Sequence, residues 1–211
     1  MLRQGRTTPA QKRALDELLP VYGIPFGERI ASRRGAPLVL EIGSGMGETT
    51  AAIAKAHPEL EFIAIEVHGP GVGALLKQVA EHELKNVRVV RHDAMEVLER
   101  MVPDEALAAI HLFFPDPWPK KRHHKRRLVQ ASFAKLAATK LKEGAILHAA
   151  TDWPDYAEHM HAMLSAEPLL EPAEKGLVAR PLTKFESRGQ RLGHPIRDLY
   201  FRRRQKARAT R

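Results

Sequence analysis

The stretch that decides the fold is Glu41-Ile-Gly-Ser-Gly-Met-Gly47, in which an acidic residue precedes glycines at every second position. It lies between two short apolar runs, residues 37–42 and 61–66, that have the pattern of buried strands. A dinucleotide-binding turn follows G-x-G-x-x-G, but the position three beyond Gly45 is Glu48. A carboxylate there would repel a pyrophosphate at the start of the next helix. The turn therefore favours a neutral or cationic adenosyl ligand.

Outward from this turn, strand patterns alternate with helical patterns across short connections. The expected strands are residues 37–42, 61–66, 86–91, 107–114, 144–150 and 196–202. The expected helices are residues 48–57, 73–84, 94–101, a long one from the basic run at 120–127 to about 141, and 156–164. This alternation predicts an α/β fold with a parallel sheet and helices on both of its faces.

Residues 1–30 contain three prolines and lack strong periodicity. We expect them to form an extended, flexible arm that could become ordered on a partner. No domain boundary or internal repeat is visible after residue 30. Residues 31–211 are therefore predicted to form a single domain with a basic C-terminal tail.

Composition excludes several classes of protein. The chain of 211 residues has no cysteine, which rules out disulfides and thiolate metal sites. Its histidines show no metal-ligand spacing beside an acid on a predicted helix, so no metal is expected. No apolar run approaches the 18 residues of a membrane helix, and no apolar segment follows the charged N-terminus as in a secretory signal. We expect a cytoplasmic protein that does not enter membranes.

The charge is strongly basic and clustered. Lys and Arg total 34 against 25 Asp and Glu, a net charge of +9. Residues 120–127 are all basic, and six more cations lie between Arg202 and Arg211. Such clusters are typical of proteins that bind polyphosphates, although a solubilising tail is the alternative for the C-terminal cluster.

Four acidic residues lie at or just past the ends of successive predicted strands: Glu41, Glu66, Asp93 and Asp116. The carboxyl ends of parallel strands meet at one edge of a sheet, where ligands of open α/β folds bind. Glu66 is placed to accept both hydroxyls of a ribose, and Asp93 to accept from an adenine amino group. The alternative for each is a surface charge or a helix N-cap, and this alternative is strongest for Asp93.

The segment Phe113-Phe-Pro-Asp-Pro-Trp-Pro-Lys120 contains three prolines within five residues, which cannot continue a strand or a helix. It predicts a rigid loop that holds Asp116 and presents the flat face of Trp118 to a base, with cations from Lys120 onward for phosphates. A proline-rich connector with a half-buried tryptophan is the alternative. Asp152, just after the fifth expected strand, is predicted to point to the same mouth.

Together these motifs closely resemble the bacterial tRNA (guanine-N7)-methyltransferases, over about residues 38–204. The resemblance rests on residues 41–47, 65–68, 92–94, 112–120, 122–130, 151–153 and 183–186. The segment around Pro115-Asp-Pro-Trp118 is specific to that family, whereas the glycine turn is shared by many methyltransferases. The resemblance implies a Rossmann-like class I methyltransferase fold with a mostly parallel seven-stranded sheet. It also implies S-adenosyl-L-methionine as co-substrate and transfer of its methyl group to N7 of the variable-loop guanine, position 46, of tRNA.

Residue roles follow from the resemblance position by position. It implies that Asp116 is the active-site residue. The cofactor site would be formed by Glu41, Gly43, Gly45, Glu66, Asp93 and Asp116. The tRNA substrate would be held by Lys120, Asp152, Thr183, Lys184, Phe185 and Glu186.

Guanine N7 carries a free lone pair, so its methylation needs positioning and charge stabilisation but no general base. Asp116 or Glu186 could stabilise the charge, and the sequence does not divide the roles between them. Two alternatives stay open: a methyltransferase for another nucleic-acid base or a small molecule, and a non-catalytic RNA-binding module on the same fold. A monomer and a homodimer are both compatible with the sequence.

Overall fold

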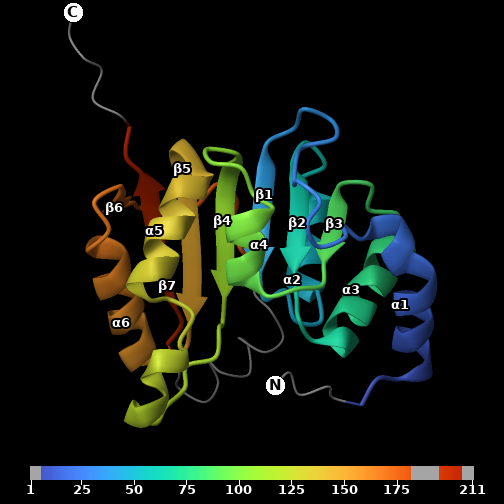
Figure 1. Cartoon of the computed structure of the whole chain (residues 1–211), viewed down its shortest axis with the longest axis horizontal. Coiled ribbons are helices and arrows are strands. Elements are labelled where there is room, and N and C mark those ends of the chain that lie inside the picture. Colours follow the sequence, from blue (N-terminus) through green and yellow to red (C-terminus); the bar gives the residue numbers. More distant parts are fainter. Residues whose placement is uncertain (1–5, 182–194, 206–211) are drawn as a thin grey trace, which may run out of the picture.

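The computed structural model describes residues 6–181 and 195–205. Its centre is a seven-stranded sheet in the order β3-β2-β1-β4-β5-β7-β6 (Figure 1). The strands are β1 (Leu38–Ile42), β2 (Glu61–Ile65), β3 (Val87–Val90), β4 (Leu107–Phe113), β5 (Leu141–Thr151), β6 (Leu170–Pro172) and β7 (Arg197–Arg203). Strands β1 to β5 pair in parallel, and β7 runs antiparallel to both β5 and β6. The predicted α/β class with a mostly parallel sheet of seven strands is confirmed.

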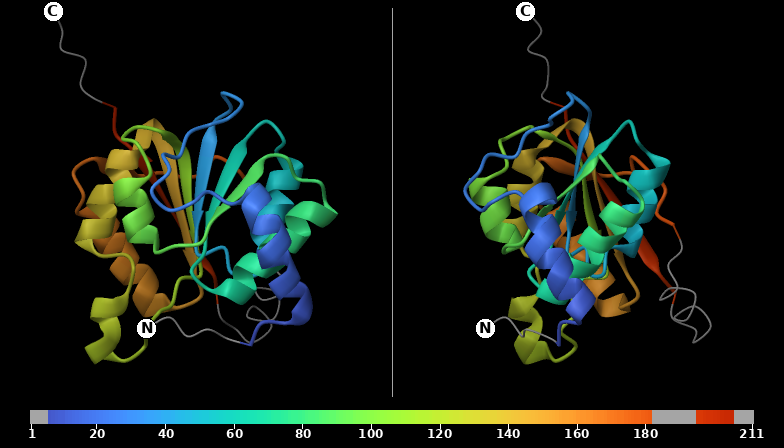
Figure 2. Two further views of the ribbon diagram at one scale, coloured as in Figure 1. Left: turned by 45° about the vertical axis from the view of Figure 1, so that its right-hand side comes forward. Right: turned by 90° about the vertical axis from the view of Figure 1, so that its right-hand side faces the viewer.

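Helices cover both faces of the sheet (Figure 2). They are α1 (Pro9–Tyr22), α2 (Glu48–Ala56), α3 (Gly69–Glu81), α4 (Ala94–Arg100), α5 (Ala131–Lys140) and α6 (Pro154–Ser165). The core is correspondingly split in two: α4, α5 and α6 pack on one face, and α1, α2 and α3 on the other. The central strands read as unbroken apolar runs because both of their faces are buried.

The prediction of an extended N-terminal arm is wrong for residues 9–22, which form helix α1. Thr8 and Gln11 close its first turn with a reciprocal capping box. The helix lies so close to α3 that a Cβ on Gly73 would be 2.6 Å from the carbonyl oxygen of Gln11. Pro20 lies in the last turn of α1, where it breaks the sequence pattern without ending the helix.

The residues after α1 are also part of the folded core. Gly23 forms a parallel bridge with Val89 at the edge of β3. Ile24 is 4% exposed and Ile30 is completely buried. This part of the N-terminal region therefore belongs to the same hydrophobic core as the sheet.

We expected the basic run to open a long helix, and this prediction is wrong. Residues Lys121–Arg126 form a short 3-10 helix, and α5 begins separately at Ala131. Between them, Arg127 turns inward: its side chain pairs with Asp155, and its Nε donates to the carbonyl of Pro117 at 2.9 Å. A continuous α-helix would place four or more cations at neighbouring positions near its N-terminus, which is unfavourable.

The order of strands reverses between β1 and β4. From β1 the chain continues outward through β2 and β3, and it then returns to place β4 on the opposite side of β1. This reversal leaves a crevice at the carboxyl ends of β1 and β4, the place where open α/β sheets bind ligands.

Candidate active site

The glycine turn lies at the carboxyl end of β1, and all three of its glycines have positive φ: +73° at Gly43, +56° at Gly45 and +81° at Gly47. Residues with a Cβ rarely adopt this conformation. A Cβ on Gly47 would also be 2.6 Å from Cβ of Leu75 in α3. Gly47 therefore allows the turn to pack closely against α3. A Cβ on Gly43 or Gly45 would meet no atom of the described residues within 4 Å, so the backbone at these two positions is open to a ligand.

Glu66 holds the turn in place from the end of β2. Its Oε2 accepts a hydrogen bond from the backbone N–H of Gly45 at 2.8 Å, and its Oε1 accepts from that of His68 at 2.8 Å. The side chain is thus oriented before any ligand binds. A carboxylate oxygen has lone pairs for more than one donor, so Glu66 can still accept from hydroxyl groups.

Two hollows adjoin the turn, and both are lined by Gly43. The first, about 340 Å³, is lined by Glu66, Asp93, Asp116 and Trp118 among others. The second, about 380 Å³, is lined by Glu41, residues 43–49 and the two rings of Phe113 and Phe114. The structure thus places the four predicted acids around two adjoining hollows that meet at Gly43. Each volume is in the range of small-molecule sites.

The Glu41 carboxyl is buried at the wall of the second hollow. It is 2% exposed, and its Oε2 has no hydrogen-bond partner among the described residues. Burial raises its pKa from 4.5 to about 7. A buried carboxyl with an unused oxygen at a cavity wall is suited to receive a cationic group, which would restore its ionised form.

Asp93 serves as the N-cap of α4, the alternative that the sequence left open. Its Oδ1 accepts from the backbone N–H groups of Met95 at 2.9 Å and Glu96 at 3.2 Å. Both bonds use the same oxygen, and the residue also lines the first hollow. The capping role and a ligand role are therefore compatible in one side chain.

The proline-rich loop and the basic run fold onto each other. The guanidinium of Arg126 lies 5.0 Å from the centre of the Trp118 ring, and His123 meets the same ring edge-on at 5.9 Å. Trp118 itself has a positive φ of +45°. Arg126 lines the first hollow beside Asp116, so a cation stands at the wall of the cavity that holds the predicted active-site acid.

The other predicted substrate residues are less tightly placed. Lys120 is exposed and Asp152 is half-buried just after β5, and neither lines the two hollows. Thr183, Lys184, Phe185 and Glu186 lie outside the described residues. Sequence reasoning missed the wall residues His92, Phe113, Phe114, Arg126 and Leu128, because only the three-dimensional fold brings them to the hollows.

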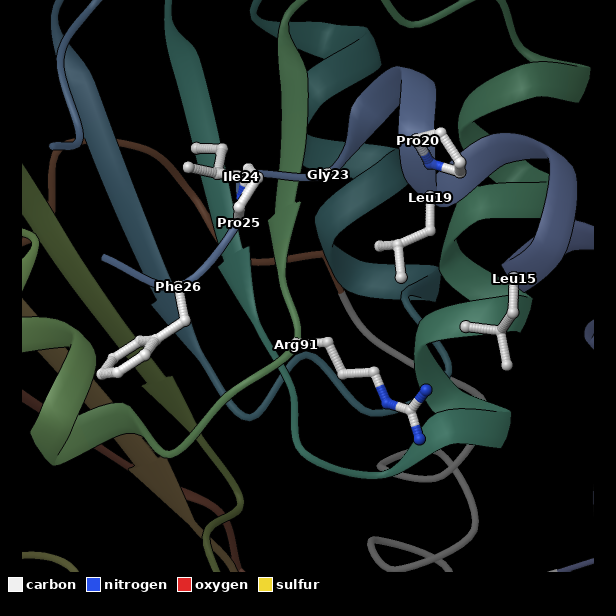
Figure 3. Close-up of a pocket in the computed structure, with 8 residues that line it drawn as sticks. All are labelled: Leu15, Leu19, Pro20, Gly23, Ile24, Pro25, Phe26 and Arg91. Atoms are coloured by element: carbon white, nitrogen blue, oxygen red, sulfur yellow. The ribbon is translucent and has the colours of Figure 1, made fainter. Parts of the chain in front are cut away.

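A further hollow of about 430 Å³ lies between α1 and β3 (Figure 3). Its lining is mostly aliphatic and proline, with Leu15, Leu19 and Phe26 together with Arg91. Arg91 extends toward α3, and its guanidinium would be 3.1 Å from a Cβ on Gly69. The described residues that line this hollow include no carboxylate to receive a ribose or an ammonium group, so it is not the candidate site.

Residues 6–181 and 195–205 include no group of three or more His, Asp or Glu side chains placed to hold a metal ion. Within the same ranges, no helix combines the length and apolar character needed to cross a bilayer.

Comparison with solved structures shows the fold. The chain is similar to the 16S rRNA (adenine(1408)-N(1))-methyltransferase of Catenulisporales acidiphilia solved with its cosubstrate, with a TM-score of 0.55, 19% identity, and coverage of 82% of this chain and 89% of that one. It is also similar to a precorrin-6y C5,15-methyltransferase of Geobacter metallireducens, with a TM-score of 0.57, 14% identity and coverage of 94% of both chains. The Rossmann-like methyltransferase fold is thus confirmed.

Comparison with known sequences shows the family. A family model described as "Putative methyltransferase" matches residues 35–199. A tRNA (guanine-N(7)-)-methyltransferase of Methylobacillus flagellatus is 55% identical over 96% of this chain and 90% of the relative. A protein of the same name from Aromatoleum aromaticum is 56% identical over 97% of this chain and 82% of the relative. This chain therefore belongs to the family of tRNA (guanine-N(7)-)-methyltransferases.

Proposed function

We propose that this protein transfers the methyl group of S-adenosyl-L-methionine to N7 of a guanine in tRNA, and that this guanine is the variable-loop base at position 46. The observation that carries the proposal is the pair of hollows that meet at Gly43, with a buried carboxyl in one and an acid beside a tryptophan in the other. An S-adenosyl donor has matching parts: an adenosine with hydroxyl and amino donors, and a cationic amino-acid end.

In the proposed complex the donor spans the two hollows. Its adenosine occupies the hollow of Glu66 and Asp93, where Glu66 accepts from the ribose hydroxyls and Asp93 from the adenine amino group. Its amino-acid end occupies the second hollow, where the α-ammonium pairs with Glu41. Gly43 and Gly45 carry no Cβ, so the donor can pass directly against the backbone between the two halves.

The reaction needs few groups from the protein. The N7 lone pair attacks the methyl carbon in line with the C–S bond, the new N–C bond forms as the C–S bond breaks, and S-adenosyl-L-homocysteine leaves. The positive charge moves from sulfur to the purine. The Asp116 carboxylate stabilises that charge or holds the guanine edge, and rigid positioning by the proline-rich loop supplies the rest.

The acceptor side is basic and aromatic. Trp118 and Arg126 present a stacked pair at the wall of the first hollow, and Lys120 and Arg122 extend the positive charge outward. Single-stranded or splayed bases bind such aromatic and guanidinium faces, while phosphates bind the surrounding cations. We assign Asp152 and residues 183–186 to the same acceptor side, following the family pattern. The proposal also places the protein in the cytoplasm, with its tRNA.

The direct test replaces Asp116 by Ala. The rate of methyl transfer to tRNA should fall at least about 100-fold, the loss typical of removing one key electrostatic group. The thermal unfolding temperature should stay close to the wild-type value because Asp116 is exposed. Asp104→Asn is the matched control, since Asp104 is also exposed and pairs with Lys140 away from the hollows. Near-normal transfer by Asp116→Ala would remove that residue from the chemistry.

A second measurement tests the basic surface. If about six cations reach phosphates, the log–log dependence of tRNA affinity on salt should have a slope steeper than about −4. A flat dependence would remove the basic run from the interface. Tight tRNA binding without any methyl transfer or donor binding would instead identify a non-catalytic RNA-binding module.

A further inference from the structure

A cluster of polar side chains lies on the face of β4, β5 and β7 that also carries α2 and α3. His111 and His148 are paired in register across β4 and β5, and His148 is paired with Tyr200 across β5 and β7. The ring of Tyr200 lies 4.3 Å from that of His148. Both histidines are at most 1% exposed. Residues 173–181, the described part of the segment after β6, cover this part of the sheet (Figure 2). A Cβ on Gly176 in that segment would be 3.2 Å from Tyr200.

The segment is fixed to the sheet through Arg180. Its Nε donates to Oδ1 of Asp198 and its second terminal nitrogen donates to Oδ2, both at 3.2 Å, which is a two-point contact. Oδ1 of Asp198 also lies 2.7 Å from Nε2 of His148. Burial alone would raise the pKa of Asp198, but the hydrogen bonds from His148 and Arg180 outweigh it and the pKa is lowered. The Arg180 side chain is only 7% exposed.

The same guanidinium lies over two aromatic rings. It is 5.5 Å from the ring centre of Phe113 and 5.2 Å from that of Phe114. Both phenylalanines line the second hollow, with Glu41 and the glycine turn. Phe114 has a positive φ of +52°, which is costly for a residue with a Cβ and persists only when its surroundings enforce it. One such restraint is the bond from its backbone N–H to the carbonyl of Ala150 at 2.8 Å.

We propose that Arg180 is a positioning residue for methyl transfer. Held by Asp198, its guanidinium keeps the rings of Phe113 and Phe114 in place as the wall of the hollow that receives the amino-acid end of the donor. Arg180 does not line that hollow, so it acts through the two phenylalanines. This inference rests on the proposed function, because a position of the wall matters only if the donor binds there.

The test compares Arg180→Met and Arg180→Lys with the wild type in steady-state methyl transfer to tRNA. Arg180→Met should lower kcat at least 10-fold, since displacement of reacting groups by about 1 Å can cost about 100-fold. The KM for tRNA should change less than threefold. Arg180→Lys keeps a cation near the rings but cannot make the two-point contact, so its kcat should be intermediate. A merely structural role would lower the amount of folded protein, not the turnover of the folded fraction.

A double-mutant cycle identifies the partner. Phe114→Leu should reproduce the fall in kcat, and Arg180→Met added to it should lower kcat less than twofold further, because both variants disturb the same contact. Arg197→Met is the control: Arg197 precedes Asp198 on β7, its side chain is half exposed, and it pairs only loosely with Glu158, at 3.9 Å. It should keep its kcat.

Each outcome decides the matter. Wild-type kcat in Arg180→Met, or additive effects of the two substitutions, would overturn the positioning role while leaving the proposed function intact. Absence of methyl transfer by the wild type itself would overturn the proposed function and this inference together. If Arg180→Met does not fold, Arg180→Lys replaces it, both alone and in the double-mutant cycle with Phe114→Leu. Wild-type kcat in Arg180→Lys, or additive effects in that cycle, would then overturn the positioning role.

Discussion

Replacing Glu41 by Gln removes one ionisable carboxyl at the cavity wall while keeping the size and shape of the side chain. Gln closely matches the protonated form of Glu. The folded protein holds the Glu41 proton up to about pH 7, whereas the unfolded chain loses it near pH 4.5. The substitution therefore measures the free energy needed to keep an ionised carboxylate in this position.

The sign and size follow from proton linkage. Between these two pH values the unfolded state has released the proton and the folded state keeps it. The free energy of unfolding of the wild type therefore falls as pH rises, by about 1.4 kcal/mol per pH unit. Over the whole interval the loss is about 3 kcal/mol. Glu41→Gln has no proton to release, so its advantage over the wild type should grow from near zero at pH 4.5 to about 3 kcal/mol at pH 8.

Urea unfolding of both proteins at several pH values between 4.5 and 8, without donor, measures this difference. Glu158→Gln is the matched control, because Glu158 is exposed and its loose pair with Arg197 contributes at most a few tenths of a kcal/mol. A difference between Glu41→Gln and the wild type that does not change with pH would refute the reasoning. It would mean that the Glu41 carboxyl is solvated or paired in the folded protein.

Three further predictions concern the turn, the cap and the core. Gly43→Ala should cost about 1 kcal/mol of stability, because residue 43 has a left-handed conformation. Gly47→Ala should cost about 2 kcal/mol more, because its Cβ would also clash with Leu75. Equal losses in urea unfolding would contradict the packing argument. Asp93→Ala should lower the free energy of unfolding by about 1 kcal/mol, whereas Asp93→Ser should keep the wild-type stability because Ser also caps helices. Both variants should weaken donor binding in calorimetry. Undiminished donor binding would show that Asp93 serves only as a helix cap. Glu61→Ala should lower the free energy of unfolding by about 3–5 kcal/mol in urea, because it leaves the buried guanidinium of Arg88 without its carboxylate partner. A loss below 1 kcal/mol would show that water reaches this pair.

The central part of the fold was predictable because its strands are buried on both faces. Such strands appear as short apolar runs, and glycines with the acids Glu41 and Glu66 mark where they end. Edge elements carry weaker patterns. Strand β6 is three residues long and contains Pro172, so no run of apolar residues indicated a strand there. Helix α1 was missed because Pro20 obscures a pattern whose apolar face only becomes evident against α3.

The members of the candidate site were largely predictable, but their connections were not. That Glu66 bonds the backbone of Gly45, or that Asp93 caps α4 with one oxygen only, depends on side-chain directions that a sequence does not specify. Arg126 and Arg127 read as two cations of one run. In the structure the first stacks on Trp118 and the second turns inward to Asp155, and this difference arises from the break between the 3-10 helix and α5.

The central claim is that one protein binds an S-adenosyl donor in the paired hollows and methylates a tRNA guanine at N7. Nucleoside mass spectrometry of tRNA incubated with the purified protein and isotope-labelled S-adenosyl-L-methionine tests it most directly. The claim predicts label in 7-methylguanosine, mapped to the variable loop, with the label lost in Asp116→Ala. Label in another nucleoside, or none with tRNA that lacks the modification, would contradict it.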